Sequence, residues 1–438
     1  MEIKSDFHFP DKVFLTGADN FFLMLESNTE KYSSGNNVIR ICLFFESQSE
    51  ADLILENISN SLFIHWICNI KLIKERFYNR AFWKYNDDQK QIATHTHQAE
   101  TDKIIPDQLL NRAIRFEKDG LIECDIIQYK SGKVGIVISL HHILIDGRGS
   151  GLLMRHLAGD LPFNAETKHH FFPKEEQKKP FYSYVMNMYK VKRFIRHSTK
   201  GKIASVAFKE APLKEENSFS LTTIYFTQEE TELIDNNARK SGARFGANNF
   251  LIACCAKVIN DVNIQRDTKG VLWIPIPYDG RKRGGIGPVI TNFISFLFYR
   301  LDTGNVNDLS ETVQNINRQM TEQLKLEIPK KYNLLLDMMR HIPLGLYRFL
   351  IKRSSKGSVA SFLFTSAGED YWDMNSLIKN SYIDINIIPP YSDPPGIIFS
   401  FLRNSNCLKM NIVSTNRHIT NAELEFIKST IVTTLSNK

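Results

Sequence analysis

The stretch VISLHHILIDGRGSGLL, residues 137–153, decides what kind of protein this chain forms. An apolar run with the character of a buried strand ends in paired histidines, His141 and His142. Asp146 stands four positions after the second histidine, and Gly147 follows it. Glycine lets a chain turn and lets another group approach the backbone closely. The stretch therefore predicts a strand that delivers two imidazoles and a carboxylate to a turn at its end.

Three chemistries fit these side chains. Imidazoles and a carboxylate can bind zinc or iron, but adjacent residues of a strand point to opposite faces, so His141 and His142 would diverge and we expect no metal site. A second interpretation is structural, with a buried histidine tied to Asp146. The third is general-base catalysis, because a neutral imidazole with a pKa near ~6.5 can take the proton of an alcohol or an amine.

His142 is the favoured base because Asp146 follows it across a glycine-rich turn. The aspartate can fix the loop and the tautomer of the ring, or anchor the loop through a salt bridge elsewhere. The chain has no GxSxG elbow and no nucleophilic cysteine context, so a covalent acyl-enzyme is not indicated. Direct attack of an acceptor on an activated acyl group fits a lone base.

Composition and charge exclude several classes of protein. The 438 residues are 42% hydrophobic and 24% charged, with a formal net charge of +7. Basic clusters occur at 189–202, 279–285 and 346–358, but they lack the aromatic interleaving and the motif context of nucleic-acid binding. We expect solvated faces, or sites for anionic lipid or an anionic cofactor, and no nucleic-acid partner.

The cysteines and the apolar runs indicate where in the cell the protein is expected. The six cysteines are scattered without a CxxC pair, and no signal peptide is visible, so we expect a cytoplasmic protein. No apolar run approaches the ~18–20 residues of a membrane span. The amphipathic segment 342–353 could touch a membrane face, although packing on the core is the favoured interpretation.

Helix and strand patterns alternate along the chain and predict an α/β fold in two halves. The strands expected at 121–130 and 133–142 form a hairpin around a Ser-Gly turn. We expect an N-terminal subdomain over 1–163, a linker or crossover segment over 164–216 and a C-terminal subdomain over 217–438.

The heptapeptide HHILIDG resembles the HHxxxDG motif of the CoA-dependent acyltransferase superfamily, which includes chloramphenicol acetyltransferase, condensation domains and wax ester synthase/diacylglycerol acyltransferases. FLTGADNFFLMLE (14–26) is similar to the opening of the wax ester synthase-like branch. SGARFGANNFLIACCAKVI (241–259) looks like a helix of that branch, and VLWIPIPYDGR (271–281) and TNFISFLFYRL (291–301) look like its strands. The resemblance covers nearly the whole chain and is closest to that branch.

This resemblance implies a fold and an activity. The fold is an α+β two-layer sandwich of two chloramphenicol-acetyltransferase-like subdomains, with an active-site tunnel between them. No cofactor stays bound; acyl-CoA or a phosphopantetheinyl thioester on an acyl carrier protein is the co-substrate, and an alcohol is the acceptor. A monomer is sufficient, since both halves lie in one chain.

The resemblance also assigns roles to residues of the motif. His142 is the general base, Asp146 is its structural partner, and His141 and Gly147 complete the motif. Arg281 matches the arginine that forms a salt bridge with the motif aspartate.

Four further residues are candidates for the tunnel or the oxyanion site. Asn292, Ser295 and Asn248 line the tunnel by analogy, although asparagine at a helix start also acts as a cap. Ser366, within FTSAGED (364–370), is a candidate donor to the thioester oxyanion.

The sequence thus predicts an O-acyltransferase that moves an acyl group from a thioester to a hydroxyl and forms an ester. An amide-forming condensation-type enzyme remains the alternative among enzymes, since the same base serves both reactions. A non-catalytic condensation-like binding domain is the alternative outside enzymes.

Overall fold

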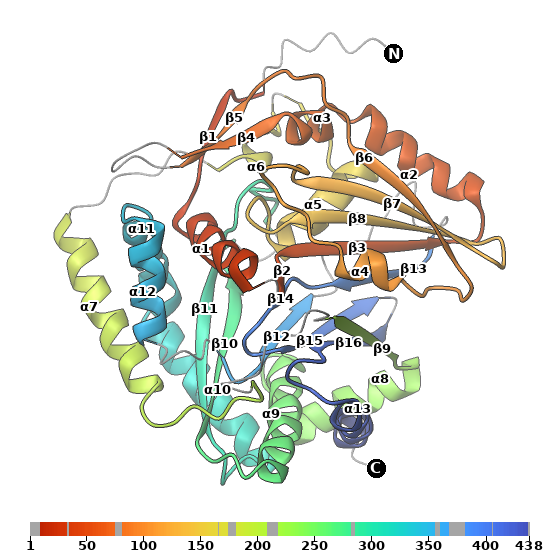
Figure 1. The fold of residues 1–438 in the computed structure, drawn as a ribbon. Coiled ribbons are helices and arrows are strands. Elements are labelled where there is room, and N and C mark those ends of the chain that lie inside the picture. The colour runs from red at the N-terminus through yellow and green to blue at the C-terminus, as the bar shows by residue number, and fades with distance from the viewer. Residues whose placement is uncertain are drawn as a thin grey trace.

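The chain folds into two α/β halves, stacked one above the other in the view of Figure 1. A helical layer formed by α1, α7, α11 and α12 stands along one edge of both. The computed structural model describes residues 9–32, 35–74, 81–164, 166–173, 181–207, 218–281, 285–354, 360–367, 382–404 and 406–436.

The N-terminal half is built on a five-stranded sheet in which β6 and β7 are parallel and the other neighbours are antiparallel. Every residue of β3 and β8 is buried, because one face of the sheet packs on helices and the other faces the second half. The strands, in spatial order, are β13 (Tyr382–Ile388), β3 (Val38–Phe45), β8 (Val134–His141), β7 (Ile122–Tyr129) and β6 (Ala93–Ala99).

Helices and a small sheet complete this half. A three-stranded sheet lies at its outer end, formed by β1 (Lys12–Phe14), β5 (Phe82–Tyr85) and β4 (Ile70–Ile73). The two-residue strands β2 (Gly35–Asn36) and β14 (Tyr391–Ser392) pair with each other. The helices are α1 (Gly17–Tyr32), α2 (Gln48–Asn60), α3 (Leu62–Cys68), α4 (Asp107–Asn111) and α5 (Gly147–Leu157).

The C-terminal half contains a four-stranded sheet and a long two-stranded ribbon. The sheet follows the order β12 (Leu363–Ala367), β15 (Ile397–Asn404), β16 (Cys407–Thr415) and β9 (Phe219–Tyr225), and the ribbon is β10 (Val271–Asp279) with β11 (Ile294–Asp302). Its helices are α8 (Gln228–Lys240), α9 (Asn248–Gln265), α10 (Leu309–Lys325), α11 (Ile328–Met339), α12 (Leu344–Ser354) and α13 (Asn421–Ser436). The apolar helix α9 carries a largely buried run and forms the centre of this core.

The segment 164–216, expected to be a linker or crossover, contains the helices α6 (Lys168–Phe171) and α7 (Phe181–Ser198). Helix α7 packs against α11, and its Val191 is fully buried. Residues 174–180 and 208–217 lie outside the described residues. The segment is therefore partly integrated into the helical layer, while the predicted domain boundaries stay predictions.

The two halves share a strand. β13 follows most of the C-terminal half in sequence, yet it pairs with β3 and forms the edge of the N-terminal sheet. Polar side chains join it to β16: Lys409 forms a buried ion pair with Asp384, and the Asn411 side chain donates to Asn386 Oδ1 at 2.7 Å.

The mixed α/β architecture of two subdomains that the sequence predicts is confirmed. None of the helices in the described ranges combines the length and the hydropathy that crossing a bilayer requires. The active-site tunnel between the halves stays a prediction.

Candidate active site

His142 occupies the first position after β8, where the chain turns toward α5. Its backbone N–H donates to the carbonyl oxygen of Asn37 at 2.8 Å, which fixes the start of the turn. The imidazole stacks on the ring of Phe22 from α1, with ring centroids 3.9 Å apart and an interplanar angle of 21°. Phe22 was not among the predicted site residues, and the resemblance of residues 14–26 was the only signal for it.

The surroundings of His142 keep its ring neutral. Burial lowers the pKa of the imidazole from 6.5 to about 4, and the nearby charge of Asp146 opposes this shift only in part. Its Nδ1 is buried and has no hydrogen-bond partner among the described residues. At neutral pH the site therefore holds an uncharged imidazole, the form that can accept a proton.

His141 has different neighbours from His142. Its Nδ1 accepts a hydrogen bond from the backbone N–H of Ile143 at 3.3 Å, and its Nε2 lies 3.6 Å from Glu26 Oε1. The ring is fully buried and packs edge-on against Phe116. The imidazole rings of His141 and His142 therefore contact different residues. Within the described ranges, no group of three or more His, Cys, Asp or Glu side chains is placed to bind a metal ion.

The carboxylate of Asp146 joins the start of α5 to the loop between β10 and β11. Its Oδ1 caps α5 by accepting from the backbone N–H of Gly149 at 2.7 Å. Its Oδ2 accepts from Arg281 Nη1 and from the backbone N–H of Phe293, both at 2.8 Å. The side chains of Asp146 and Arg281 are each 1% exposed. Of the two roles open to the aspartate, the structure shows the salt bridge that anchors the loop.

Arg281 belongs to a network of ion pairs that also contains Asp146 and Asp279. Its guanidinium donates twice to the carbonyl oxygen of Pro288, at 2.7 and 3.1 Å, and Nη1 lies 3.2 Å from Asp279 Oδ1. Arg148, on α5, donates to Asp279 Oδ2 at 2.9 Å. Burial alone would lower the pKa of Arg281, but the carboxylates of Asp146 and Asp279 raise it above its ordinary value. The sequence analysis missed Arg148 and Asp279, although both stand within two residues of a predicted site residue.

The side chain of Asn292 forms hydrogen bonds with the backbone of the turn after β8. Its Nδ2 donates to the carbonyl oxygens of His142 at 2.7 Å and of Ile143 at 3.1 Å. Asp19 of α1 accepts from the backbone N–H and the side chain of Asn292, at 2.6 and 3.0 Å. Burial raises the pKa of Asp19 to about 6, against these hydrogen bonds, which lower it. Asn292 therefore contacts the backbone of the predicted base, and Asp19 is a further residue that the site analysis of the sequence missed.

Among the described residues, none of the other predicted tunnel residues forms a hydrogen bond with His142. Ser295 is buried and its hydroxyl donates to the carbonyl oxygen of Pro329 at 2.6 Å, which joins β11 to α11. Asn248 and Ser366 line one cavity of about 630 Å³ in the C-terminal half, whose lining contains neither His142 nor Asp146. Residues 368–370 of the stretch that contains Ser366 lie outside the described residues.

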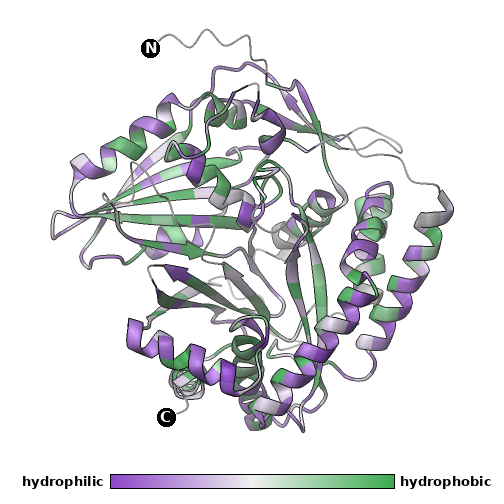
Figure 2. Ribbon diagram, turned by 180° about the vertical axis from the view of Figure 1, so that it is seen from behind, coloured by the Kyte–Doolittle hydropathy of each residue, from purple (hydrophilic) through white to green (hydrophobic). Residues whose placement is uncertain are grey.

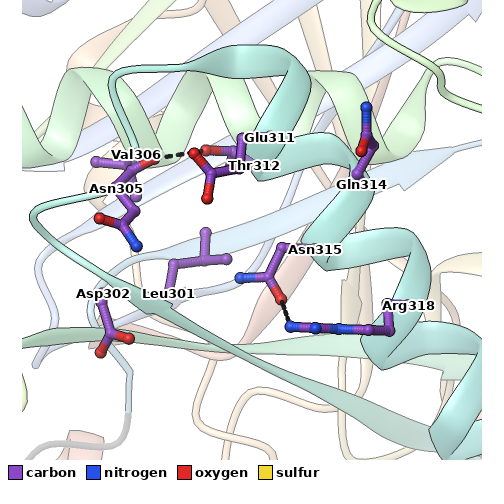
Figure 3. Close-up of a pocket in the computed structure, with 9 residues that line it drawn as sticks. All are labelled: Leu301, Asp302, Asn305, Val306, Glu311, Thr312, Gln314, Asn315 and Arg318. Atoms are coloured by element: carbon purple, nitrogen blue, oxygen red, sulfur yellow. Dashed lines mark hydrogen bonds between the residues drawn. The ribbon is translucent and has the colours of Figure 1, made fainter.

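The cavity at Ser366 is rich in guanidinium groups. Arg403 forms two hydrogen bonds with Asp235, at 2.7 and 2.9 Å, so its charge is partly compensated. Arg239 and Arg244 are exposed at the rim. A second cavity, of about 440 Å³, lies between β11 and α10, and no predicted site residue lines it (Figure 3).

We expect Gly149→Ala to destabilise the fold by about 1–3 kcal/mol, because overpacking forces neighbours apart. A Cβ on Gly149 would lie 2.6 Å from the carbonyl oxygen of Val289 and 2.8 Å from Ile145 Cγ1, whereas a Cβ on Gly147 would meet nothing within 4 Å. Gly147→Ala is therefore the matched control and should leave the unfolding midpoint in urea unchanged. Equal midpoints for the two variants would contradict the close packing of the loop.

The sequence matches the family model of the condensation domain over residues 69–334, which is more than half of the chain. The comparison with curated proteins gives no match.

Solved structures show the same fold over the full length. The chain is similar to a trichothecene 15-O-acetyltransferase from Fusarium sporotrichioides, with 13% identity, a TM-score of 0.69, and 97% of this chain and 95% of that chain covered. It is also similar to the first condensation domain of the CDA synthetase, with 12% identity, a TM-score of 0.64 and coverage of 97% and 95%. Polyketide synthase associated protein 5 from Mycobacterium tuberculosis shares 14% identity, with a TM-score of 0.63 and coverage of 97% and 98%.

The family match covers the motif loop and the β10–β11 ribbon, and it includes Asp146, Arg281 and Asn292. At this low identity the structural likeness concerns the fold alone. The chain therefore belongs to the condensation-domain family.

Proposed function

We propose that this protein is an O-acyltransferase that moves an acyl group from a thioester to a hydroxyl, with His142 as the general base. The observation that carries the proposal is the buried, neutral imidazole with an unpaired ring nitrogen, held on a fixed turn. A group in this state accepts protons at physiological pH without first losing one.

The proposed reaction needs no acyl-enzyme. His142 removes the proton of the acceptor hydroxyl while the oxygen attacks the thioester carbonyl, so that a C–O bond forms and a tetrahedral oxyanion appears. The C–S bond then breaks, and the imidazolium returns its proton to the leaving thiolate. The products are an ester and a free thiol. Asp146, Arg281 and Asn292 position the loop and do not take part in the proton transfer.

The donor is proposed to be acyl-CoA or an acyl chain on the phosphopantetheine arm of a carrier protein. In support, the cavity at Ser366 and Asn248 has Arg239 and Arg244 at its rim, and guanidinium groups pair well with phosphate. Ser366, the oxyanion donor that the sequence predicts, lines this cavity, and the lining does not include His142.

The hydroxyl acceptor rests on the resemblance to the wax ester synthase-like branch, and the similar trichothecene 15-O-acetyltransferase also modifies oxygen. Amide formation is the second candidate, because the family model that matches is that of condensation domains. Both reactions use the same base, so product analysis separates them.

We expect the acid limb of kcat/KM to lie near pH 4. The pKa of His142 is lowered to about 4, so the base is neutral above that pH and becomes protonated, and inactive, as the pH falls through it. An unperturbed histidine would give a limb near ~6.5. The measurement is kcat/KM for the thioester against pH, with the unfolding midpoint recorded at each pH. A limb near 6.5 in a folded protein would contradict a buried base.

The test of the function is thiol release from a panel of acyl-CoAs and acyl-carrier thioesters in the presence of pooled alcohols and amines. Release that depends on the acceptor, with an ester identified by product mass, supports the proposal. An amide product would favour the condensation-type alternative. Hydrolysis without any acceptor product would count against acyl transfer. Short N-acetylcysteamine thioesters, which lack phosphate, provide the comparison for the role of the arginine-rimmed cavity.

A further inference from the structure

Helix α7 has two apolar faces. Its inward face packs on the core through Val191, Phe194 and Ile195. The outward face carries a second apolar stripe at the helical spacing of three and four residues, and this stripe is open to solvent. Its members are Tyr182, Val185, Met186 and Tyr189, with exposed fractions of 73%, 37%, 37% and 62%.

The C-terminal part of the same helix is cationic. Lys190, Lys192, Arg193 and Arg196 are exposed, and none of them forms an ion pair with a described residue. In sequence, α7 contains no aspartate or glutamate. The exposed apolar stripe therefore runs into a purely basic segment on one helix.

Helix α12 also exposes apolar side chains. It too lacks acidic residues, and it exposes Leu346, Phe349 and Leu350, again three and four positions apart. Figure 1, and Figure 2 from behind, show α7 and α12 at the same edge of the molecule, where α7 packs against α11 and β11. We call the exposed side chains of α7 and α12 named in these paragraphs the α7–α12 face.

We propose that the α7–α12 face binds the surface of an anionic lipid bilayer. Aromatic and aliphatic side chains enter the boundary between headgroups and acyl chains, while nearby lysines and arginines remain at the level of the anionic headgroups. Tyrosine, which α7 exposes twice, is enriched at this boundary because one end of its side chain is apolar and the other polar.

Charge complementarity favours a lipid surface over a second copy of the chain. In a symmetric dimer through this face the unpaired cations of one α7 would meet those of another, since neither helix offers a carboxylate. An anionic bilayer compensates all of them at once and tolerates any arrangement of the apolar side chains. The proposal does not depend on acyl transfer, because none of the residues of the candidate active site belongs to this face.

The test is co-sedimentation of the full-length protein with vesicles of phosphatidylcholine alone and of phosphatidylcholine mixed with phosphatidylglycerol. We expect binding to the mixed vesicles, weak binding to the neutral ones, and loss of most binding at high salt. One variant reverses charge on the face (Lys190→Glu, Arg193→Glu, Arg196→Glu), and its matched control reverses three exposed lysines elsewhere (Lys118→Glu, Lys240→Glu, Lys269→Glu).

The charge variant should partition at least about tenfold less onto the mixed vesicles, and its control should bind less than threefold weaker. A second pair tests the apolar side chains: Tyr189→Ser, Phe349→Ser and Leu350→Ser on the face, and Leu62→Ser, Ile104→Ser and Ile264→Ser, which are similarly exposed, elsewhere. The face variant should again lose at least about tenfold, with an unchanged unfolding midpoint.

Three outcomes would overturn the proposal. The first is that the wild type does not sediment with the mixed vesicles. The second is that the face variants and their controls lose binding equally. The third is a dimer in sedimentation velocity that the apolar face variant dissociates, which would identify the face as a contact between two copies.

Discussion

Replacing His142 with alanine is expected to lower acceptor-dependent thiol release by roughly 10²–10⁴-fold, the contribution of a positioned general base. Burial lowers the pKa of this imidazole to about 4, and its Nδ1 has no hydrogen-bond partner among the described residues. The measurement is kcat/KM for wild type and variant with the same acyl thioester and acceptor. His142→Gln, which retains polarity and much of the volume, should lose activity to a similar degree.

Two controls separate chemistry from folding in this experiment. His169, which is exposed on α6, should be replaceable by alanine without loss of activity. The unfolding midpoint of His142→Ala reports the cost of emptying the space beside Phe22. If acyl transfer persists at the wild-type rate in a folded His142→Ala protein, His142 is not the base.

The second large effect is expected for Arg281→Met, which should destabilise the fold by about 3–5 kcal/mol. Its removal leaves the carboxylate of Asp146 buried with backbone donors alone, and an uncompensated buried charge is costly. Urea unfolding measures the free energy. Since Asp146 also caps α5 and holds the turn of His142, acyl transfer should fall as well.

Asp279→Asn is the matched control for this pair. Asp279 also accepts from Arg281, but its side chain is 28% exposed, so water replaces part of the lost interaction and the destabilisation should be smaller. The double variant Asp146→Asn with Arg281→Met should lose less stability than the two single variants together, because the partners depend on each other. A loss for Arg281→Met no larger than for Asp279→Asn would show that the ion pair does not hold the loop.

Local pattern was enough to predict much of the motif region. The apolar run before His141, the Ser-Gly turn and the glycines after Asp146 predict a buried hairpin followed by a helix, and β7, β8 and α5 occupy those places. These features depend on neighbours in sequence, where period and turn residues report structure directly. The contact of Arg281 with Asp146, 135 residues away, came from the family resemblance and not from any local signal.

Other parts of the site could not be found in this way. Asp19 holds Asn292 across 273 positions, and Phe22 stacks on His142 from a helix that is merely apolar in sequence. The hydrogen bond from the Ser295 hydroxyl to the carbonyl oxygen of Pro329 likewise has no signal in the local sequence. A hydroxyl or an amide in a sequence does not show which long-range partner it will meet, and burial near a strand end suits both a structural and a catalytic role.

The shared strand β13 has a consequence for how the protein is made. A ribosome releases the chain from its N-terminus, so β3 is synthesised more than 330 residues before Tyr382–Ile388 is available to cover its edge. During that interval one edge of β3, which is apolar except for Arg40, has unpaired backbone groups, the kind of template on which strands of other chains add. The N-terminal half therefore completes its sheet only after residues 382–388 have been synthesised, and a chain that terminates before residue 382 retains an unpaired edge strand.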